Sequence, residues 1–194
     1  MHSTFRLPLL VLVIIAVPRP ALACWTPVEK DSSLTFHNDQ PGGSAITGEF
    51  TEYDGFLCLD PADAGSGRLW LSVETASVTT DLPELDEALI GPMFFNSSRW
   101  SRATFESASM EKLDAEHRYR VTGRFTLRDA SRTLEVPFTF VRDGDSAKLT
   151  GSATIDRLDY GVGQGQWRDT RWADNEVRLE FDIKLVESAE PAGE

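Results

Sequence analysis

The stretch YRVTGRFTLR, at residues 119–128, decides the class of the fold. Its apolar positions recur at every second residue from Tyr119 to Leu127, with one gap at Gly123. The polar positions between and beside them include four arginines, Arg118, Arg120, Arg124 and Arg128. A period of two sends successive side chains to opposite faces of a strand. One dry face and one wet face are typical of an antiparallel sheet wrapped around a single interior.

The same alternation recurs on both sides of this stretch, and it predicts about eight strands separated by turn signals. The turns include NDQPGG at residues 38–43 and the hairpin signal DGD at residues 143–145. The inward rows include small residues, namely Gly48, Gly123, Gly151 and Ala153. Small inward residues leave volume unfilled, and glycine lets strands bend into closure. The pattern therefore favours a closed barrel with a cavity over a fully packed sandwich.

The alternation breaks once, over DLPELDEAL at residues 81–89. Asp81 is a plausible N-cap, and Pro83 suits the first helical turn. Three leucines at helical spacing share one face, Leu82, Leu85 and Leu89. We expect a short helix over residues 83–90 that turns Leu85 and Leu89 toward the interior, partly closes the pocket mouth and keeps its acidic side chains in solvent.

Residues 1–23 have the pattern of a secretory signal peptide. A basic start precedes the apolar run LPLLVLVIIAV at residues 7–17, and PRPALA at residues 18–23 ends in an A-x-A pattern. The run is too short to span a bilayer as a helix, and the prolines after it disfavour a retained anchor. We expect a periplasmic or secreted protein with one barrel domain at residues 24–187 and a flexible tail at residues 188–194.

The expected mature chain is strongly acidic. The whole chain carries a formal charge of −12 at pH 7, and cleavage before Cys24 removes Arg6 and Arg19, which leaves −14. Such a surface repels phosphate backbones and anionic lipid headgroups. Nucleic acid is therefore not expected among the partners.

Two cysteines follow the cleavage site, Cys24 and Cys58. In an oxidising compartment such a pair favours a disulfide, with Cα atoms about 4.4–6.8 Å apart. The alternative is acylation of Cys24, because a cysteine directly after the cleavage site is where bacterial lipoproteins carry their lipid. That signal usually has leucine three residues earlier, where this chain has Ala21. We therefore favour the disulfide.

Three motifs follow one another between residues 86 and 167. Asp86 and Leu89 precede FFN at residues 94–96 and ATFES at residues 103–107. The other two motifs are YRVTGRFTLRDASRTLEVPF at residues 119–138 and IDRLDYGVGQGQW at residues 155–167. In this order the three segments resemble the signature of the YceI-like family. Two places depart from it: Asp129 stands where the family usually has glycine, and Trp100-Ser101 where it has a tyrosine–proline pair.

The resemblance implies an all-β fold, a lipocalin-like antiparallel barrel of about eight strands with one short helix near the pocket mouth. It also implies an exported binding protein that holds an isoprenoid-type lipid, a polyprenyl chain or a quinone, in an apolar cavity. The alternative function is an accessory redox protein that works with a membrane cytochrome through a bound quinone. A homodimer is a further partner arrangement that we consider.

The candidate ligand-binding residues combine the excess of aromatic side chains with the helix leucines. They are Phe50, Trp70, Leu85, Leu89, Phe94, Phe95, Phe105, Gly123 and Phe125. We expect one continuous cavity in which Gly123 supplies free space. If the Phe94-Phe95 pair is extended, only one of its two rings can point fully inward.

The sequence carries no catalytic or metal-binding pattern that we recognise. The two histidines after the signal peptide, His37 and His117, lack the spacing of a transition-metal site, and there is no G-x-S-x-G elbow. Arg157 is expected to hold a strand end through an ion pair. We therefore expect a protein that is not an enzyme and needs no cofactor other than a bound isoprenoid lipid or quinone.

Overall fold

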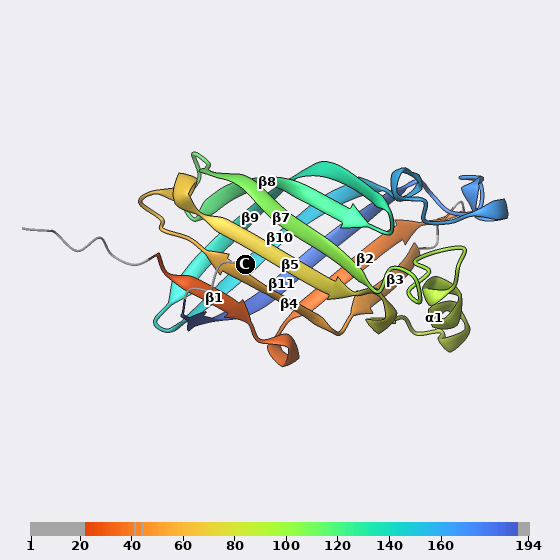
Figure 1. Ribbon diagram of the computed structural model, residues 1–194, viewed down its shortest axis with the longest axis horizontal. Coiled ribbons are helices and arrows are strands. Elements are labelled where there is room, and N and C mark those ends of the chain that lie inside the picture. The colour runs from red at the N-terminus through yellow and green to blue at the C-terminus, as the bar shows by residue number, and fades with distance from the viewer. Residues whose placement is uncertain (1–21, 41, 44, 190–194) are drawn as a thin grey trace, which may run out of the picture.

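The computed structural model describes residues 22–40, 42–43 and 45–189, so the expected signal peptide lies outside it except for residues 22 and 23. Within this part of the chain, eleven strands form one antiparallel sheet (Figure 1). The strands are β1 (Cys24–Pro27), β2 (Ser33–Asp39), β3 (Ala45–Phe50), β4 (Tyr53–Cys58), β5 (Arg68–Glu74), β6 (Val78–Thr79), β7 (Arg102–Lys112), β8 (Arg118–Leu127), β9 (Ala130–Asp143), β10 (Ser146–Asp156) and β11 (Glu176–Ser188). The α-helix is α1 (Pro83–Ile90), and short 3-10 turns are η1 (Glu29–Asp31), η2 (Ala64–Ser66), η3 (Thr75–Ser77), η4 (Arg157–Tyr160) and η5 (Gly165–Arg168).

The sheet closes on itself. Strands β1, β4, β5, β7, β8, β9, β10 and β11 are neighbours in that order, and β11 pairs back onto β1. The closed ring therefore has eight strands, and the predicted all-β barrel with one helix is confirmed. Closure removes the free edges that an open sheet would present to other chains.

Three of the barrel's long strands are each broken into two. Strands β1 and β2 flank η1, β3 and β4 flank residues 51–52, and β5 and β6 flank η3. The halves β2, β3 and β6 pair with one another beside β11, as the halves β1, β4 and β5 do nearer the other end. The breaks are bonded to each other, because Thr51 N donates to Ser77 O and Glu74 N donates to Glu52 O. Three neighbouring strands thus bend together, and this extends the barrel toward α1.

The end of the barrel away from α1 is plugged by packed side chains. Trp25 and Tyr119 are almost fully buried there, and the ring of Trp25 meets that of Phe140 edge to face with centroids 5.6 Å apart. The disulfide between Cys24 and Cys58 closes the same end, as predicted. The two cysteines are directly opposed across β1 and β4, and their Cα atoms lie 3.9 Å apart, below the expected range. This bond occupies the sulfur that the acylation alternative requires.

At the other end lies α1, with the expected bounds (Figure 1). Leu89 is buried and Leu85 half-buried, while Glu84 and Glu87 are exposed, as expected. Two details differ. The N-cap is Leu82 rather than Asp81, and no side chain caps the helix; Leu82 is 59% exposed because it precedes the first turn and does not share the buried face. In the part of the chain that the structure describes, no helix is long and apolar enough to cross a membrane.

Strand β8 has the two faces that its sequence predicts. Tyr119, Val121 and Leu127 are buried, and Arg120 lies 3.0 Å from Glu111 on the outer face. Arg128 is the exception, since the strand ends at Leu127 and Arg128 enters the hairpin to β9 with a φ of 56°. Its side chain leaves the wet face of the sheet, and its contacts are described below.

Candidate functional site

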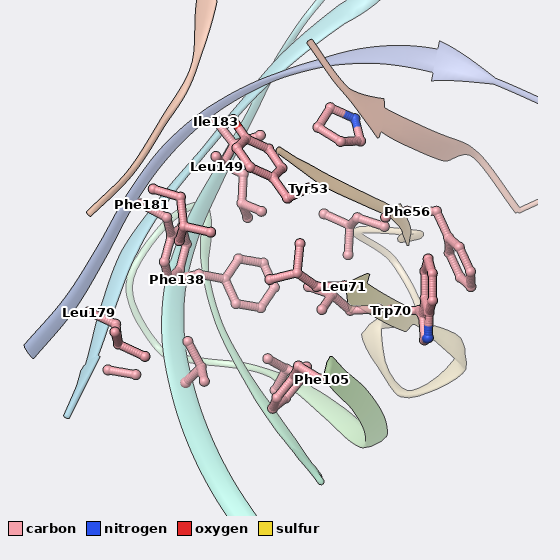
Figure 2. A pocket seen from close by; sticks show the side chains of 18 of the residues that line it. Tyr53, Phe56, Trp70, Leu71, Phe105, Phe138, Leu149, Leu179, Phe181 and Ile183 are labelled. Carbon is pink, nitrogen blue, oxygen red and sulfur yellow. The ribbon is translucent and has the colours of Figure 1, made fainter. Parts of the chain in front are cut away.

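The barrel encloses two apolar chambers along its length. The inner chamber, of about 140 Å³, lies between the plugged end and the middle of the barrel, and its wall includes Phe105, Val121 and Phe138 (Figure 2). The outer chamber, of about 190 Å³, lies beneath α1. Each is comparable to the engineered cavity of about 150 Å³ that binds benzene. The interior is therefore hollow on the scale of a hydrocarbon ligand.

The two chambers meet in the middle of the barrel. Four side chains belong to the walls of both, Leu34, Leu71, Phe125 and Leu179. They come from β2, β5, β8 and β11, which lie around the barrel. All four are partly buried and pack against the core, and each also borders a chamber. The interior therefore has two chambers that share part of their walls, where one continuous cavity was expected.

Three aromatic rings lie over glycines, in space that a Cβ would otherwise occupy. A Cβ on Gly48 would come within 2.3 Å of the Phe36 ring, one on Gly123 within 2.5 Å of the Phe105 ring, and one on Gly151 within 2.5 Å of the Phe181 ring. The Phe36–Gly48 and Phe181–Gly151 pairs are directly opposed across neighbouring strands. Such rings cover the bare backbone of the glycine on the adjacent strand.

Gly123 therefore acts differently from the prediction. The space above it is occupied by the Phe105 ring, and Gly123 is absent from the walls of both chambers. It creates room indirectly, since it gives the ring a place to lie against the sheet. The other predicted ligand-binding residues all contribute to a chamber wall, Phe50, Leu85, Leu89, Phe94 and Phe95 to the outer one, Trp70 and Phe105 to the inner one, and Phe125 to both.

Trp70, Phe94 and Phe95 reach the chamber walls in different ways. The ring of Trp70 stacks on that of Phe56, its direct partner on β4, with centroids 6.2 Å apart. Figure 2 shows this pair to one side of the inner chamber, beyond Leu71. Phe94 and Phe95 both border the outer chamber, because residues 92–95 form a turn and not the extended segment that would send one ring outward.

The outer chamber is closed by a layer that we call the cover, which consists of α1, residues 91–100 and residues 161–175. Leu85 and Leu89 contribute from α1, and the ring of Phe94 meets that of Trp167 with centroids 5.5 Å apart. The two loops are joined, because the backbone N–H groups of Gly163 and Gln164 both donate to Met93 O, at 2.9 and 2.7 Å. Positive φ angles at Gly161, Gly163 and Gly165 allow the second loop to turn sharply.

Arg157 anchors this second loop. Its guanidinium is buried and donates to the carbonyl oxygens of Val162, Trp167, Ala173 and Asp174 at distances between 2.7 and 3.0 Å. The expected ion pair is wrong, since the hydrogen-bond partners of Arg157 are backbone carbonyls rather than a carboxylate. Burial lowers the pKa of Arg157 from its ordinary value, an effect that the charge of Asp174 partly offsets. The charge of Arg157 is thus held by the loop backbone, and the residue also forms part of the wall of the outer chamber.

The remaining polar side chains of the outer chamber are also occupied by the backbone. Asn38 donates to the carbonyl oxygens of Asp174 and Glu176, both at 2.9 Å. The Thr75 hydroxyl lies 2.9 Å from Trp100 O and is almost fully buried. These groups therefore fix the strand ends and leave the cavity surface apolar.

A second arginine fastens the cover from outside. Arg128 donates to the carbonyl oxygens of Phe94 and Gly161, one in each loop of the cover. Its guanidinium also lies 4.7 Å from the centre of the Trp100 ring, and burial lowers its pKa. Trp100 is one of the two departures from the family signature, and Asp129, beside Arg128, is the other. Both departures thus lie at this fastening and not in a chamber wall.

The sequence missed several wall residues, among them Leu34, Phe36, Leu71, Phe138, Leu179 and Phe181. All of them stand on the inward rows of the alternation, so the signal was present. What singled out the predicted residues was aromatic character or membership of a motif, and neither decides whether a side chain borders space. Tyr53 and Arg157 are the titratable side chains in the two walls, and among the described residues no cluster of three or more His, Cys, Asp or Glu side chains could hold a metal ion.

Comparison with known proteins gives the same architecture. A UPF0312 protein of Shewanella sp. strain ANA-3 is 28% identical over 137 residues, which cover 68% of this chain and 71% of that protein. The crystal structure of Burkholderia cenocepacia BcnA matches with a TM-score of 0.78 and 25% identity, over 81% of this chain and 98% of that one. A structure described as a polyisoprenoid binding domain from Saccharophagus degradans matches with a TM-score of 0.67 and 14% identity, over 87% and 100% of the two chains. The YceI-like domain model matches residues 25–185, nearly all of the barrel, and the chain therefore belongs to the YceI-like family.

Proposed function

We propose that the protein binds an isoprenoid-type lipid, a polyprenyl chain or a quinone, in its two chambers. The observation that carries the proposal is the cavity: two apolar chambers that follow one another along the barrel and share four wall residues. This shape suits a chain rather than a compact ring system. The description of the Saccharophagus degradans structure as a polyisoprenoid binding domain supports the same ligand class.

Apolar burial alone gives useful affinity. Scaled from benzene, the two chambers hold a chain of roughly ten carbons without any rearrangement. At about 0.8 kcal/mol for each buried methylene, such a chain gains roughly 8 kcal/mol, less the cost of immobilising it. Roughly 8 kcal/mol corresponds to a Kd near the micromolar range before that cost is subtracted, so apolar burial supplies most of the binding free energy that such a site requires.

The site favours a carrier over an enzyme. The guanidinium of Arg157 is engaged by four carbonyl groups, and the other titratable wall residue, Tyr53, is a buried phenol whose pKa is raised by desolvation. A general acid or base needs a pKa near the working pH and a free proton site, whereas the pKa of Tyr53 is raised above 10.0 and the guanidinium of Arg157 is fully engaged by carbonyl groups. Export is part of the proposal, because the disulfide suits an oxidising compartment such as the periplasm.

Mass spectrometry of an organic extract of the purified protein tests the ligand directly. A polyprenyl chain in near-stoichiometric amount is the expected result, and a quinone would also fit and would favour the redox role beside a membrane cytochrome. Two variants test the site: Ala153→Leu narrows the inner chamber and Ala103→Leu the outer one. Ala108→Leu is the control, since Ala108 is exposed on β7. Equal lipid content in all three variants and the wild type would rule out the cavity as the binding site.

A further inference from the structure

The large apolar side chains that remain in water gather on the cover. Six are markedly exposed among the described residues. Three of them belong to the cover, Ile90 at 38%, Met93 at 41% and Trp172 at 62%, and Leu82, at 59%, directly precedes it. The other two, Val141 and Val186, lie near the plugged end, where Val186 pairs with Ser146 beside the β9–β10 hairpin. The end of the barrel that closes the outer chamber is thus its most apolar exposed surface.

The cover is apolar on both of its faces. Leu89 borders the outer chamber and the next residue, Ile90, is exposed. Phe94 and Ala173 likewise border the chamber, whereas their sequence neighbours Met93 and Trp172 are exposed. A layer that separates a cavity from water needs apolar side chains on its inner face only. Apolar side chains on the outer face therefore point to a second apolar environment outside the cover.

The cover is also held in place. The bonds from Gly163 and Gln164 to Met93 O join its two loops, and Arg157 and Arg128 fasten them from inside and outside. The exposed residues therefore form a defined surface rather than frayed loop tips. Trp172 suits such a surface, because a tryptophan side chain is favoured where an apolar phase meets water.

The charges near this surface restrict what it can meet. The cover has three basic residues, Arg99, Arg168 and Arg171, and five acidic ones, Glu84, Asp86, Glu87, Asp169 and Asp174, so its formal charge is −2. Glu84 and Glu87 are exposed on α1, and Arg171 lies 2.5 Å from Asp169. The whole described protein is acidic as well. Anionic lipid headgroups are therefore repelled, whereas the headgroups of an uncharged phospholipid surface are not.

We propose that the cover docks on the surface of an electrically neutral phospholipid bilayer, with Ile90, Met93 and Trp172 inserted among the headgroups. The inference rests on the proposed function, because an isoprenoid lipid resides in a bilayer and has to cross from it into the outer chamber. Docking by the cover places the chamber directly against the lipid source. The cargo then passes through one layer of protein and does not enter water.

Co-flotation with phosphatidylcholine vesicles tests this docking. The cover variant combines Ile90→Ser with Trp172→Ser, and the control variant combines Val141→Ser with Val186→Ser, which have similar exposure at the other end. All four positions are exposed, so both variants should fold. We expect the vesicle partition coefficient of the cover variant to fall about tenfold or more, and that of the control variant to stay within about twofold of the wild type. Phosphatidylglycerol added to the vesicles should weaken the wild type.

The lipid content of each sample separates this proposal from the proposed function. A wild-type protein that carries lipid but does not float with the vesicles overturns the docking and leaves the carrier function standing. Equal flotation of the cover variant and the wild type, equal losses in both variants, or stronger flotation with phosphatidylglycerol would overturn it too. Flotation that depends on the cover in a protein without lipid would support docking and count against the carrier function.

Discussion

Replacing Gly48 with alanine tests how the outer chamber is kept open. A Cβ at this position would lie 2.3 Å from the Phe36 ring and 3.0 Å from the backbone oxygen of Thr79. The ring has to give way, because ordinary contact begins near 3.4 Å and the ring is therefore about 1.1 Å too close. Gly48 is the best of the three glycines beneath rings for this purpose, since a Cβ on Gly123 or Gly151 would meet backbone oxygen at 2.4 or 2.6 Å.

The expected effect is modest on stability and specific for the ligand. Overpacking a core costs about 1–3 kcal/mol, and alanine in place of glycine within a strand returns about 0.5–1 kcal/mol, so we expect a loss of about 1 kcal/mol. Phe36 borders the outer chamber, so the displaced ring removes space for about one methylene of the ligand. The affinity should then fall by about 0.8 kcal/mol, which is about fourfold.

Urea unfolding measures the first quantity, and titration with retinol, a fluorescent isoprenoid alcohol, measures the second. Gly65→Ala is the matched control, because Gly65 is exposed and a Cβ there would meet Asp63 at an ordinary 3.6 Å. The control should change neither quantity. A Gly48→Ala protein that binds retinol as tightly as the wild type would show that the position of the Phe36 ring does not limit the outer chamber. The argument that rings over glycines keep the chambers open would then be wrong.

Two further predictions concern the scaffold. Reducing the bond between Cys24 and Cys58, which closes a loop with a sequence separation of 34, should lower the free energy of unfolding by about 3–4 kcal/mol, measured by urea titration with and without reductant; an unchanged midpoint would contradict it. All three tyrosines, Tyr53, Tyr119 and Tyr160, have pKa values raised above 10.0, with desolvation as the largest cause. Their neutral form is favoured in the folded state, so their contribution to stability is complete below pH 10 and is lost as the pH rises through the folded pKa values. Tyrosinate absorbance that appears near pH 10 while the protein is still folded would refute this.

The sequence predicts the barrel well because the alternation of apolar and polar residues follows directly from strand geometry. The inward rows through Phe105, Val121 and Phe138 are all found inside. The helix and the disulfide were also predictable, the first from leucine spacing and the second from the two cysteines of an exported chain. Local rules failed where a tertiary contact overrides them. Arg128 continues the polar alternation of its strand, yet it turns at the hairpin and binds two loops that are distant in sequence.

The contacts that hold the cover could not be predicted from the sequence. Arg157 is held by four carbonyl groups of a loop that has no periodic pattern. Its sequence neighbours Asp156 and Asp159 instead suggest an ion pair. The predicted helix cap is also wrong, because the side chain of Asp81 does not cap α1. Asp86 instead accepts hydrogen bonds from the backbone nitrogen and the hydroxyl of Thr80, both at 2.7 Å.

Whether a barrel is hollow is the hardest question for a sequence, since inward rows look the same above a packed core and above a cavity. The small inward residues predict a cavity, and the barrel has one, but the free space does not lie above the glycines. Glycine leaves space only when no neighbour fills it, and here Phe36, Phe105 and Phe181 cover Gly48, Gly123 and Gly151. We attribute the free volume to the rings, because a ring that lies over a glycine leaves the centre of the barrel open. Cross-strand register decides which phenylalanine meets which glycine, and register links Phe36 to Gly48 and Phe181 to Gly151 across different strand pairs. Composition alone does not contain that pairing, so it becomes readable only when the order of strands is known.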